Sequence, residues 1–434
     1  MNHYKQLKDK ITKRKAKICI MGLGYVGLPL AVEFAKKGYF MYGYDPNASR
    51  INKLFKGKQY IIDVDPKETL DLIRNRKLHP ATYQKMICDS DVIIICVPTP
   101  LRKVKFPDVS YVISAAKTVA KNIRPGTLVI LESTSYPGTT REVVLPILKK
   151  TGLEPEKDFF LCFSPERVNP GDKKFPFTKI PKAVGGMSKE STELAQLLYA
   201  KIMKKVYTVS SPEVAEASKL LENTFRLVNI ALINEYAMVC HKLGISVWEV
   251  IESAKTKPFG YMPFYPGPGI GGHCIPCDPV FLSWKLKTLG FKTKIIDLAT
   301  YMNRYMPLYV VERVDGILTE QKKMLSGSRV LVLGVAYKKD VKDLRESPAL
   351  EIIEGLEDKH VHVSYYDPLF PYLKMNDIDL RSIELSENSL KRFDCVVLVT
   401  DHSDVDYEFI RKNANVVFDT RNVYKKDYKN VIKL

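Results

Sequence analysis

A segment rich in glycine and proline, residues 259–278, contains the side chains best suited to covalent chemistry. So many of these residues can shape a loop whose backbone presses closely against a ligand. Cys274 ends the loop and Asp278 follows four residues later, so the pair is a candidate nucleophile beside a candidate base. Cys274 and Cys277 can also be two buried thiols, or a redox or zinc pair. A single C-x-x-C without a second pair supports zinc poorly, and we expect no metal site.

Other polar residues occur where helices and strand ends would gather them. Lys219 and Asn223 are four residues apart and share one face of a helix, where they could point into a site or form a solvated stripe. Residues 96–99, 132–134 and 164–167 each follow a strand-like run. Because ligands of open α/β sheets bind beyond the carboxyl ends of the strands, these three segments are candidate binding loops.

A glycine fingerprint near the start of the chain predicts a dinucleotide site. Gly22, Gly24 and Gly27 form G-x-G-x-x-G between a strand-like run and a helical pattern, as a turn around a pyrophosphate requires. Asp45 ends the next apolar run, 23 residues after Gly22, close to the expected spacing of about 20. A carboxylate there binds ribose hydroxyls and favours NAD over NADP. Arg50 could serve a 2′-phosphate, stack on adenosine or be a solvated surface charge.

The elements that must position these residues alternate between strands and helices. Strand-like runs at 18–21, 39–44, 92–97, 128–131 and 160–163 are separated by helical stretches such as 110–122 and 141–149. This alternation predicts an α/β fold with a parallel, doubly wound sheet. Residues 213–243 contain neither glycine nor proline and have apolar residues at helical spacing, which predicts one long helix bridging domains or forming a subunit interface.

The strand pattern returns near the C-terminus, at 329–334, 362–367 and 394–399, in the order of the first three runs of the chain. This weak internal repeat predicts a second Rossmann-like lobe. It has Ala336 where the first lobe has Gly24, so we expect it to bind a different phosphorylated ligand. The predicted domains are a dinucleotide-binding domain at 1–208, a central helical domain at 209–310 and a second Rossmann-like domain at 311–434.

Composition excludes several protein classes. The chain has 434 residues, of which 45% are hydrophobic and 27% charged, typical of globular domains and unlike disordered or collagen-like chains. Eight scattered cysteines do not suggest a disulfide framework, and no apolar run reaches about 18 residues, so we expect a cytoplasmic protein. The net charge of +18 favours anionic partners. Nucleic acid is one alternative, but the basic residues are dispersed and no finger or RNP motif occurs.

Eight motifs in order resemble the UDP-glucose/GDP-mannose 6-dehydrogenase family, most closely the bacterial UDP-N-acetylglucosamine 6-dehydrogenases of surface-polysaccharide synthesis. They are GLGYVGLPLA at Gly22, CVPTPL at Cys96, ESTSYPGTT at Glu132, FSPERVNPGD at Phe163, ENTFRLVNIALINE at Glu222, FYPGPGIGGHCIP at Phe264, AYKKDVKDLRESPA at Ala336 and DTRNVY at Asp419. The resemblance implies oxidation of a sugar C6 alcohol to a carboxylate by two NAD molecules through a cysteine adduct, with a UDP-sugar substrate.

The resemblance also implies roles for individual residues. Cys274 matches the nucleophile that forms the thiohemiacetal and thioester, Lys219 and Asn223 match oxyanion donors, and Asp278 with Thr134 matches the pair that positions water. Glu166 matches a glutamate of proton transfer or thioester hydrolysis. The implied cofactor residues also include Tyr25, Val26, Pro98, Thr99 and Arg345, and the implied substrate residues include Arg167, Val168, Tyr265, Gly269, Gly271, Tyr337, Lys338 and Arg421.

Three questions stay open at this point. Many UDP-glucose enzymes have lysine where Cys277 stands, which favours the N-acetyl branch and leaves Cys277 without a role. Gluco and galacto sugars differ by one hydroxyl, which no pattern here distinguishes. A single-step β-hydroxyacid dehydrogenase, which needs no nucleophilic cysteine, is a rival, and the C-terminal lobe speaks against it. The long helix favours a homodimer.

Overall fold

A computed structural model describes the chain except for residues 1, 62, 102–105, 169–174, 273 and 376. The chain forms two compact units. The first comprises Met1–Glu222 with Val280–Gly290, and the second comprises Asn223–Pro279 with Phe291–Leu434. The division into three domains predicted from the sequence stays a prediction.

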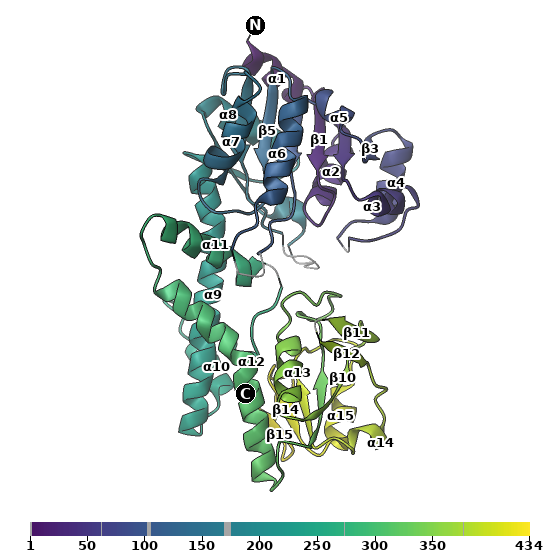
Figure 1. Cartoon of the computed structure of the whole chain (residues 1–434), viewed down its shortest axis with the longest axis vertical. Helices are drawn as coiled ribbons and strands as arrows, with labels where there is room; N and C mark the ends of the chain where they lie inside the picture. The colour runs from purple at the N-terminus through teal and green to yellow at the C-terminus, as the bar shows by residue number, and fades with distance from the viewer. Residues whose placement is uncertain (1, 62, 102–105, 169–174, 273, 376) are drawn as a thin grey trace. The chain divides into compact units, whose positions relative to one another are not determined.

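The first unit is built on an eight-stranded sheet in the order β3-β2-β1-β4-β5-β6-β7-β8 (Figure 1). Its strands are β1 (Lys17–Met21), β2 (Phe40–Tyr44), β3 (Leu78–Ala81), β4 (Val92–Ile95), β5 (Thr127–Leu131), β6 (Phe159–Phe163), β7 (Lys182–Gly186) and β8 (Val206–Val209). All neighbours are parallel except β6 and β7. The predicted strands β1, β2, β4, β5 and β6 pair in parallel as expected, and β7 was not among the predicted strands. No crossover α-helix lies in the described part of the connection between β6 and β7, and antiparallel neighbours need none.

Helices cover both faces of this sheet. Ile18 and Ile20 of β1 pack in one core cluster, whereas Cys19 and Met21 pack in another, as the alternation of side chains along a strand requires. One face carries α1 (His3–Thr12), α2 (Gly27–Lys36), α3 (Ala48–Phe55), α4 (Pro66–Arg74) and α8 (Lys189–Tyr199), and the other carries α5 (Lys85–Cys88), α6 (Ser110–Asn122), the π-helix η1 (Thr140–Val144) and α7 (Leu145–Lys149). A single-turn 3-10 helix, η2 (Phe177–Lys179), precedes β7. The doubly wound fold is confirmed.

The second unit combines helices with a smaller parallel sheet. Its helical part contains most of α9 (Pro212–Leu243), α10 (Val247–Ala254), the start of α11 (Cys274–Thr288) and α12 (Ile295–Glu320). The sheet order is β10-β9-β13-β14-β15, with β9 (Arg329–Leu333), β10 (His362–Tyr366), β13 (Cys395–Leu398), β14 (Val417–Asp419) and β15 (Val431–Lys433). A hairpin of β11 (Tyr372–Met375) and β12 (Ile378–Arg381), and the helices α13 (Pro348–Glu357), α14 (Glu387–Leu390) and α15 (Tyr407–Asn413), complete it.

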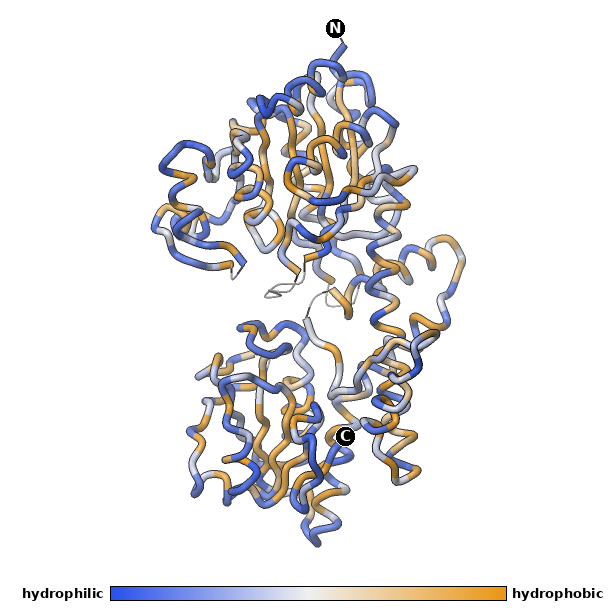
Figure 2. Tube along the Cα trace, turned by 180° about the vertical axis from the view of Figure 1, so that it is seen from behind, coloured by the Kyte–Doolittle hydropathy of each residue, from blue (hydrophilic) through white to orange (hydrophobic). Residues whose placement is uncertain are grey.

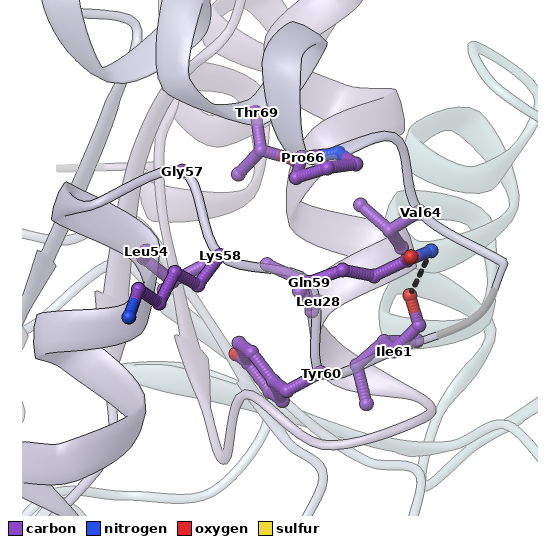
Figure 3. A pocket seen from close by; sticks show the side chains of 10 residues that line it. All are labelled: Leu28, Leu54, Gly57, Lys58, Gln59, Tyr60, Ile61, Val64, Pro66 and Thr69. Atoms are coloured by element: carbon purple, nitrogen blue, oxygen red, sulfur yellow. Dashed lines mark hydrogen bonds between the residues drawn. The ribbon is translucent and has the colours of Figure 1, made fainter.

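Hydrophobic residues concentrate along the strands and on the helix sides that face them (Figure 2). In the second unit α12 and α13 pack on one face of the sheet, and α14 and α15 pack on the other. Across the residues that the structure describes, no helix is long and apolar enough to cross a bilayer.

The internal repeat is visible in the geometry of the two sheets. Gly22 after β1 and Gly334 after β9 have φ of +99° and +83°. The N–H of each glycine donates at 2.8 Å to the carbonyl oxygen of the last residue of the neighbouring strand. A Cβ on Gly22 would lie 2.4 Å from the Cys96 carbonyl oxygen, and one on Gly334 would lie 2.4 Å from that of Thr400. The two turns therefore need glycine for the same reason.

Candidate active site

The glycine turn after β1 fits a dinucleotide. A Cβ on Gly27 would lie 1.9 Å from the carbonyl oxygen of Gly22, so only glycine allows α2 to start this close to the strand. A Cβ on Gly24 would meet nothing within 4 Å, which leaves the backbone there open to a ligand. Free N–H groups at a helix N-terminus attract phosphate, so NAD bound here would place its pyrophosphate over Gly24 and the start of α2.

Asp45 is fixed beside this turn. Its side chain is 2% exposed, and its Oδ2 accepts hydrogen bonds from the Leu23 N–H at 2.9 Å and from Arg50 Nη1 at 3.1 Å. Its Oδ1 accepts from the Asn47 N–H at 2.9 Å. Arg50 thus forms an ion pair with the carboxylate expected to bind ribose, which favours neither a 2′-phosphate site nor an isolated surface charge.

Replacing Asp45 by asparagine is expected to weaken NAD binding selectively. The KM for NAD should rise about tenfold or more, because a hydrogen bond to a charged group contributes roughly 1.5–3 kcal/mol. The kcat at saturating NAD should stay near its original value, and the KM for NADP should fall as the carboxylate charge disappears. Steady-state kinetics with both cofactors measures this, with Asp65→Asn at the start of α4 as the control, and an unchanged KM for NAD would contradict the assignment.

The candidate loops after β4 and β5 lie together. Ser133 Oγ accepts a hydrogen bond from the Val97 N–H at 2.9 Å, and the Cys96 carbonyl faces the glycine turn. The structure therefore gathers these loops at the carboxyl edge of the sheet, as expected. The remaining residues predicted to contact the cofactor in this unit differ in exposure: Tyr25 and Pro98 are exposed, Val26 and Thr134 are partly buried, and Thr99 is buried.

Glu166, in the loop after β6, has one oxygen held and one without a hydrogen bond. Its Oε1 accepts hydrogen bonds from the N–H groups of Arg167 and Val168, both at 2.6 Å. Its Oε2 is buried and has no hydrogen-bond partner among the described residues. The Arg167 guanidinium pairs with Glu222 at 2.5 Å and donates to the Pro181 carbonyl at 3.0 Å. Because Glu166 Oε2 accepts no hydrogen bond from any residue that the structure describes, it can accept a proton.

The long helix and the cysteine helix carry the other predicted catalytic residues. Lys219 and Asn223 are one turn apart on α9 and are 9% and 5% exposed. Asn223 Nδ2 donates to Asp278 Oδ2 at 2.5 Å, and Asp278 is 2% exposed. Cys274, by contrast, is exposed. It is the first residue of α11, where the partial positive charge of the helix end favours an anion.

Cys277 has a different environment from Cys274. It is 5% exposed, and burial, with the nearby Asp278 and Glu346 carboxylates, raises the pKa of its thiol to about 12. Cys277 is therefore a neutral thiol at physiological pH. Of the two thiols, only Cys274 is both exposed and at a helix N-terminus.

No group of residues able to hold a metal ion occurs within the described part of the chain.

The loop before Cys274 packs against the C-terminal lobe within the second unit. A Cβ on Gly271 would lie 2.6 Å from Tyr337 Cβ, and one on Gly269, whose φ is +133°, would lie 3.1 Å from Pro348. The Gly272 N–H donates to the Arg345 carbonyl at 2.9 Å. The close packing of the protein around Gly269 and Gly271 explains why these positions have no side chain. That the two glycines contact substrate stays a prediction.

The other predicted binding residues of this unit lie along the same segments. Arg421 Nε donates to the Val399 carbonyl at 2.7 Å, and an Arg421 Nη1 lies 2.8 Å from where a Cβ on Gly267 would be. Tyr265 is exposed and donates to Glu252 at 2.8 Å. Arg345 forms an ion pair with Asp343 at 2.6 Å, and Lys338 is partly buried. The structure thus gathers the loop with Tyr337 and Arg421.

Three residues missed from the sequence support the site. Asn234 of α9 accepts from the Gly267 N–H at 3.0 Å and donates to Asn303 at 3.0 Å, so it ties the loop to α12. Glu216 of α9 accepts from Gly138 and Thr140, and burial raises its pKa to about 7. Lys182 forms an ion pair with Glu132 at 2.8 Å. In the sequence, each of these three residues is a polar residue inside an apolar or helical run. Such a pattern does not identify the residue with which it forms a hydrogen bond or ion pair.

Comparison with known proteins agrees with this geometry. Three models of the UDP-glucose/GDP-mannose dehydrogenase family match consecutive segments: the NAD binding domain at 16–203, the central domain at 213–305 and the UDP binding domain at 331–426. A UDP-N-acetyl-D-glucosamine 6-dehydrogenase of Pseudomonas aeruginosa is 39% identical over 81% of this chain and 82% of its own. A UDP-N-acetyl-D-mannosamine dehydrogenase of Pyrococcus horikoshii is 36% identical over 94% of this chain and 96% of its own.

The solved structures lead to the same family. A structure titled as a UDP-D-ManNAc dehydrogenase from Pyrococcus horikoshii superposes with a TM-score of 0.86 at 34% identity, covering 96% of this chain and 98% of that one. Both Rossmann-like lobes and the helical middle are included in this match. The chain therefore belongs to the UDP-glucose/GDP-mannose dehydrogenase family and is an NAD-dependent nucleotide-sugar dehydrogenase.

Proposed function

We propose that the chain oxidises the C6 alcohol of a UDP-N-acetylhexosamine, first of all UDP-GlcNAc, to the uronic acid for a surface-polysaccharide precursor. The relative from Pseudomonas aeruginosa carries this substrate in its name, whereas the one from Pyrococcus horikoshii is named for the mannosamine epimer. UDP-ManNAc, UDP-GalNAc and UDP-glucose are the alternatives. The gluco, manno and galacto sugars differ in the orientation of one hydroxyl or amide group, so discrimination rests on a few contacts.

The observation that carries this proposal is the contrast between the two thiols of α11. Reaching the acid removes four electrons, and bound NAD accepts one hydride at a time. A covalent tether keeps the half-oxidised sugar in place between the two transfers. Cys274 is exposed at a helix N-terminus and fits this role, whereas Cys277 is buried.

The proposed steps assign each residue a proton or an oxyanion. Glu166 accepts the C6 hydroxyl proton as the first hydride leaves, and the Cys274 thiolate adds to the resulting aldehyde. Lys219 and Asn223 stabilise the oxyanion of the thiohemiacetal, from which the second hydride leaves to give a thioester. Water held by Asp278 and Thr134 attacks the thioester, and the thiolate departs. In sum, alcohol, water and two NAD give carboxylate, two NADH and three protons.

The remaining assignments concern binding. We propose that Tyr265, Tyr337, Lys338 and Arg421, with the backbone at Gly269 and Gly271, hold the UDP-sugar, and that Arg167 and Val168 contact it beside Glu166. Arg345 is proposed to reach the cofactor phosphates. The contacts of the loop with Tyr337 and Arg421 support the first of these assignments.

The decisive experiment offers purified protein UDP-GlcNAc, UDP-GalNAc, UDP-ManNAc and UDP-glucose with NAD. UDP-GlcNAc is expected to give the highest initial rate, with two NADH formed per sugar consumed and uronic acid as the product. One NADH per sugar would instead favour the single-step rival, and a higher rate with another sugar would replace UDP-GlcNAc within the same reaction.

We also propose a homodimer formed through α9. Leu232, Tyr236, Val239 and Leu243 recur at intervals of four, three and four residues and are 43–66% exposed, so they form an apolar stripe along one side of the helix. An exposed stripe of this kind is typical of an interface. Light scattering is expected to give twice the chain mass of 49.4 kDa, and Leu232→Arg should shift the mass toward one chain. A wild-type protein that is monomeric in solution would exclude this interface.

A further inference from the structure

A buried cluster of charged side chains lies behind Glu166 in the first unit. Lys182, the first residue of β7, has a side chain that is 4% exposed, and that of Glu132, just after β5, is fully buried. Lys182 Nζ donates to Glu132 Oε2 at 2.8 Å and to the Pro165 carbonyl at 3.3 Å. The same nitrogen lies 3.7 Å from Glu166 Oε2. One ammonium group therefore faces two carboxylates that come from different strand ends.

Tyr199 and Cys96 border the cluster and are neutral at physiological pH, whereas the neighbouring Arg167 is charged. Tyr199, the last residue of α8, donates its hydroxyl to Glu132 Oε1, and its ring centroid lies 5.2 Å from Lys182 Nζ. Burial and the Glu132 charge raise the pKa of Tyr199, and burial also raises that of Cys96, which follows β4. The Arg167 guanidinium pairs with Glu222 and donates to the Pro181 carbonyl, and its buried Nε has no hydrogen-bond partner among the described residues.

Lys182 remains charged in this setting. Burial disfavours its ammonium form, yet the Glu132 and Glu166 carboxylates outweigh that effect, and the pKa of Lys182 lies above its usual value. Burial raises the pKa of Glu132, which Lys182 opposes. Removing a lysine from such a pair would leave a buried carboxylate uncompensated, which strongly favours its protonation.

The two carboxylate oxygens of Glu166 have different contacts. The two backbone N–H groups stabilise Oε1, whereas the buried Oε2 has no hydrogen bond within the described residues and pairs with the Lys182 ammonium at 3.7 Å. At this distance Lys182 can stabilise the charge without occupying the oxygen. Oε2 therefore keeps a lone pair for an incoming proton.

We propose that Lys182 is a positioning residue for Glu166: its ammonium, anchored by Glu132 and Tyr199, faces the Glu166 carboxylate at 3.7 Å, stabilises the negative charge there and leaves Oε2 open as a proton acceptor. This inference rests on the proposed role of Glu166 in nucleotide-sugar oxidation. Glu132 pairs with the same ammonium, so the two carboxylates share its positive charge.

Substitutions of Lys182 and of Glu132 are expected to move the acidic limb of the kcat/KM pH profile in opposite directions. Lys182→Met should move that limb to higher pH by about one unit or more, since an opposite charge nearby typically lowers a carboxyl pKa by roughly 1–3 units. Lys182→Arg should restore most of the original profile. Glu132→Gln should move the limb to lower pH, because Lys182 then serves Glu166 alone. Lys8→Met, which removes a surface partner of Glu193, is the control and should leave the profile unchanged.

A substrate-free measurement separates this inference from the proposed function. Infrared titration of free enzyme with ¹³C-labelled glutamate, with Glu166→Gln used to identify the Glu166 band, should show the same opposite shifts. If wild-type enzyme oxidises none of the four sugars, the proposed function fails, and the infrared titration still decides whether Lys182 controls Glu166. An unchanged Glu166 titration in Lys182→Met, or shifts in one direction in both variants, overturns the inference. If Lys182→Met does not fold, Glu132→Gln alone decides the sign.

Discussion

Serine at position 274 is expected to abolish uronic acid formation, lowering the rate by at least about a thousandfold, as loss of a catalytic nucleophile typically does. The serine hydroxyl is far less acidic than the thiol and is not ionised at physiological pH, so it neither captures the aldehyde nor leaves readily from an acyl intermediate. Product analysis by mass spectrometry, together with the count of NADH formed per sugar, measures the loss. In the original enzyme, a stalled turnover should show a hexose attached to Cys274.

Cys277 provides the matched control for this prediction. It lies three residues away on the same helix, is buried, and has a thiol whose pKa is raised to about 12. Cys277→Ser should keep most of the activity, with some loss of thermal stability because a hydroxyl is buried in its place. Equal loss of acid formation in both variants would contradict the assignment of Cys274, as would free aldehyde accumulating as the end product of the original enzyme.

Replacing Lys219 by alanine is expected to lower kcat by about a hundred- to a thousandfold, the usual effect of removing one oxyanion donor. The KM for the sugar should change much less, because the oxyanion exists only after the substrate has begun to react. Lys219 is 9% exposed on α9, and a charge interacts more strongly in such a buried setting than in water. Initial rates over a range of UDP-sugar concentrations separate kcat from KM.

Lys242 lies near the end of the same helix and is exposed, which makes Lys242→Ala a suitable control with the same change of charge. It should keep the kcat of the original enzyme. Lys219→Arg should recover part of the rate, because it restores a cation with a different shape. A rise in KM without any fall in kcat would place Lys219 in substrate binding and remove it from the chemistry.

Many of the regular elements were predictable because local patterns determine them. The helix predicted over 213–243 spans Pro212–Leu243, and the one predicted over 110–122 spans Ser110–Asn122. Mostly apolar runs predicted β1, β2, β4, β5, β6, β9, β10 and β13, since strands buried on both faces have no polar side to alternate with. The strands β3, β7, β8, β11, β12, β14 and β15 were not predicted. The glycine turn of the first lobe followed from spacing, because a tight strand-to-helix turn tolerates few other residues.

Pairings between distant segments could not be predicted in the same way. The antiparallel contact of β6 with β7 depends on how a connection with no crossover α-helix in its described part returns to the sheet. The Lys182–Glu132 pair joins residues 50 positions apart, and neither residue has a local pattern that names the other. Gly271 was predicted to contact substrate, and its packing against Tyr337 of a later segment was not foreseen. Such contacts arise from tertiary packing, which residue spacing does not encode.

The uneven exposure of the eight cysteines has a practical consequence for labelling. Cys88 and Cys274 are exposed, Cys96 is partly buried, and the remaining five are buried. A maleimide applied briefly to the folded protein should therefore modify two thiols, and a Cys88→Ser background should leave one fast-reacting site. A fluorophore or spin label could then be attached at the start of α11, and competition between alkylation and added nucleotide sugar would report occupancy without following any redox change.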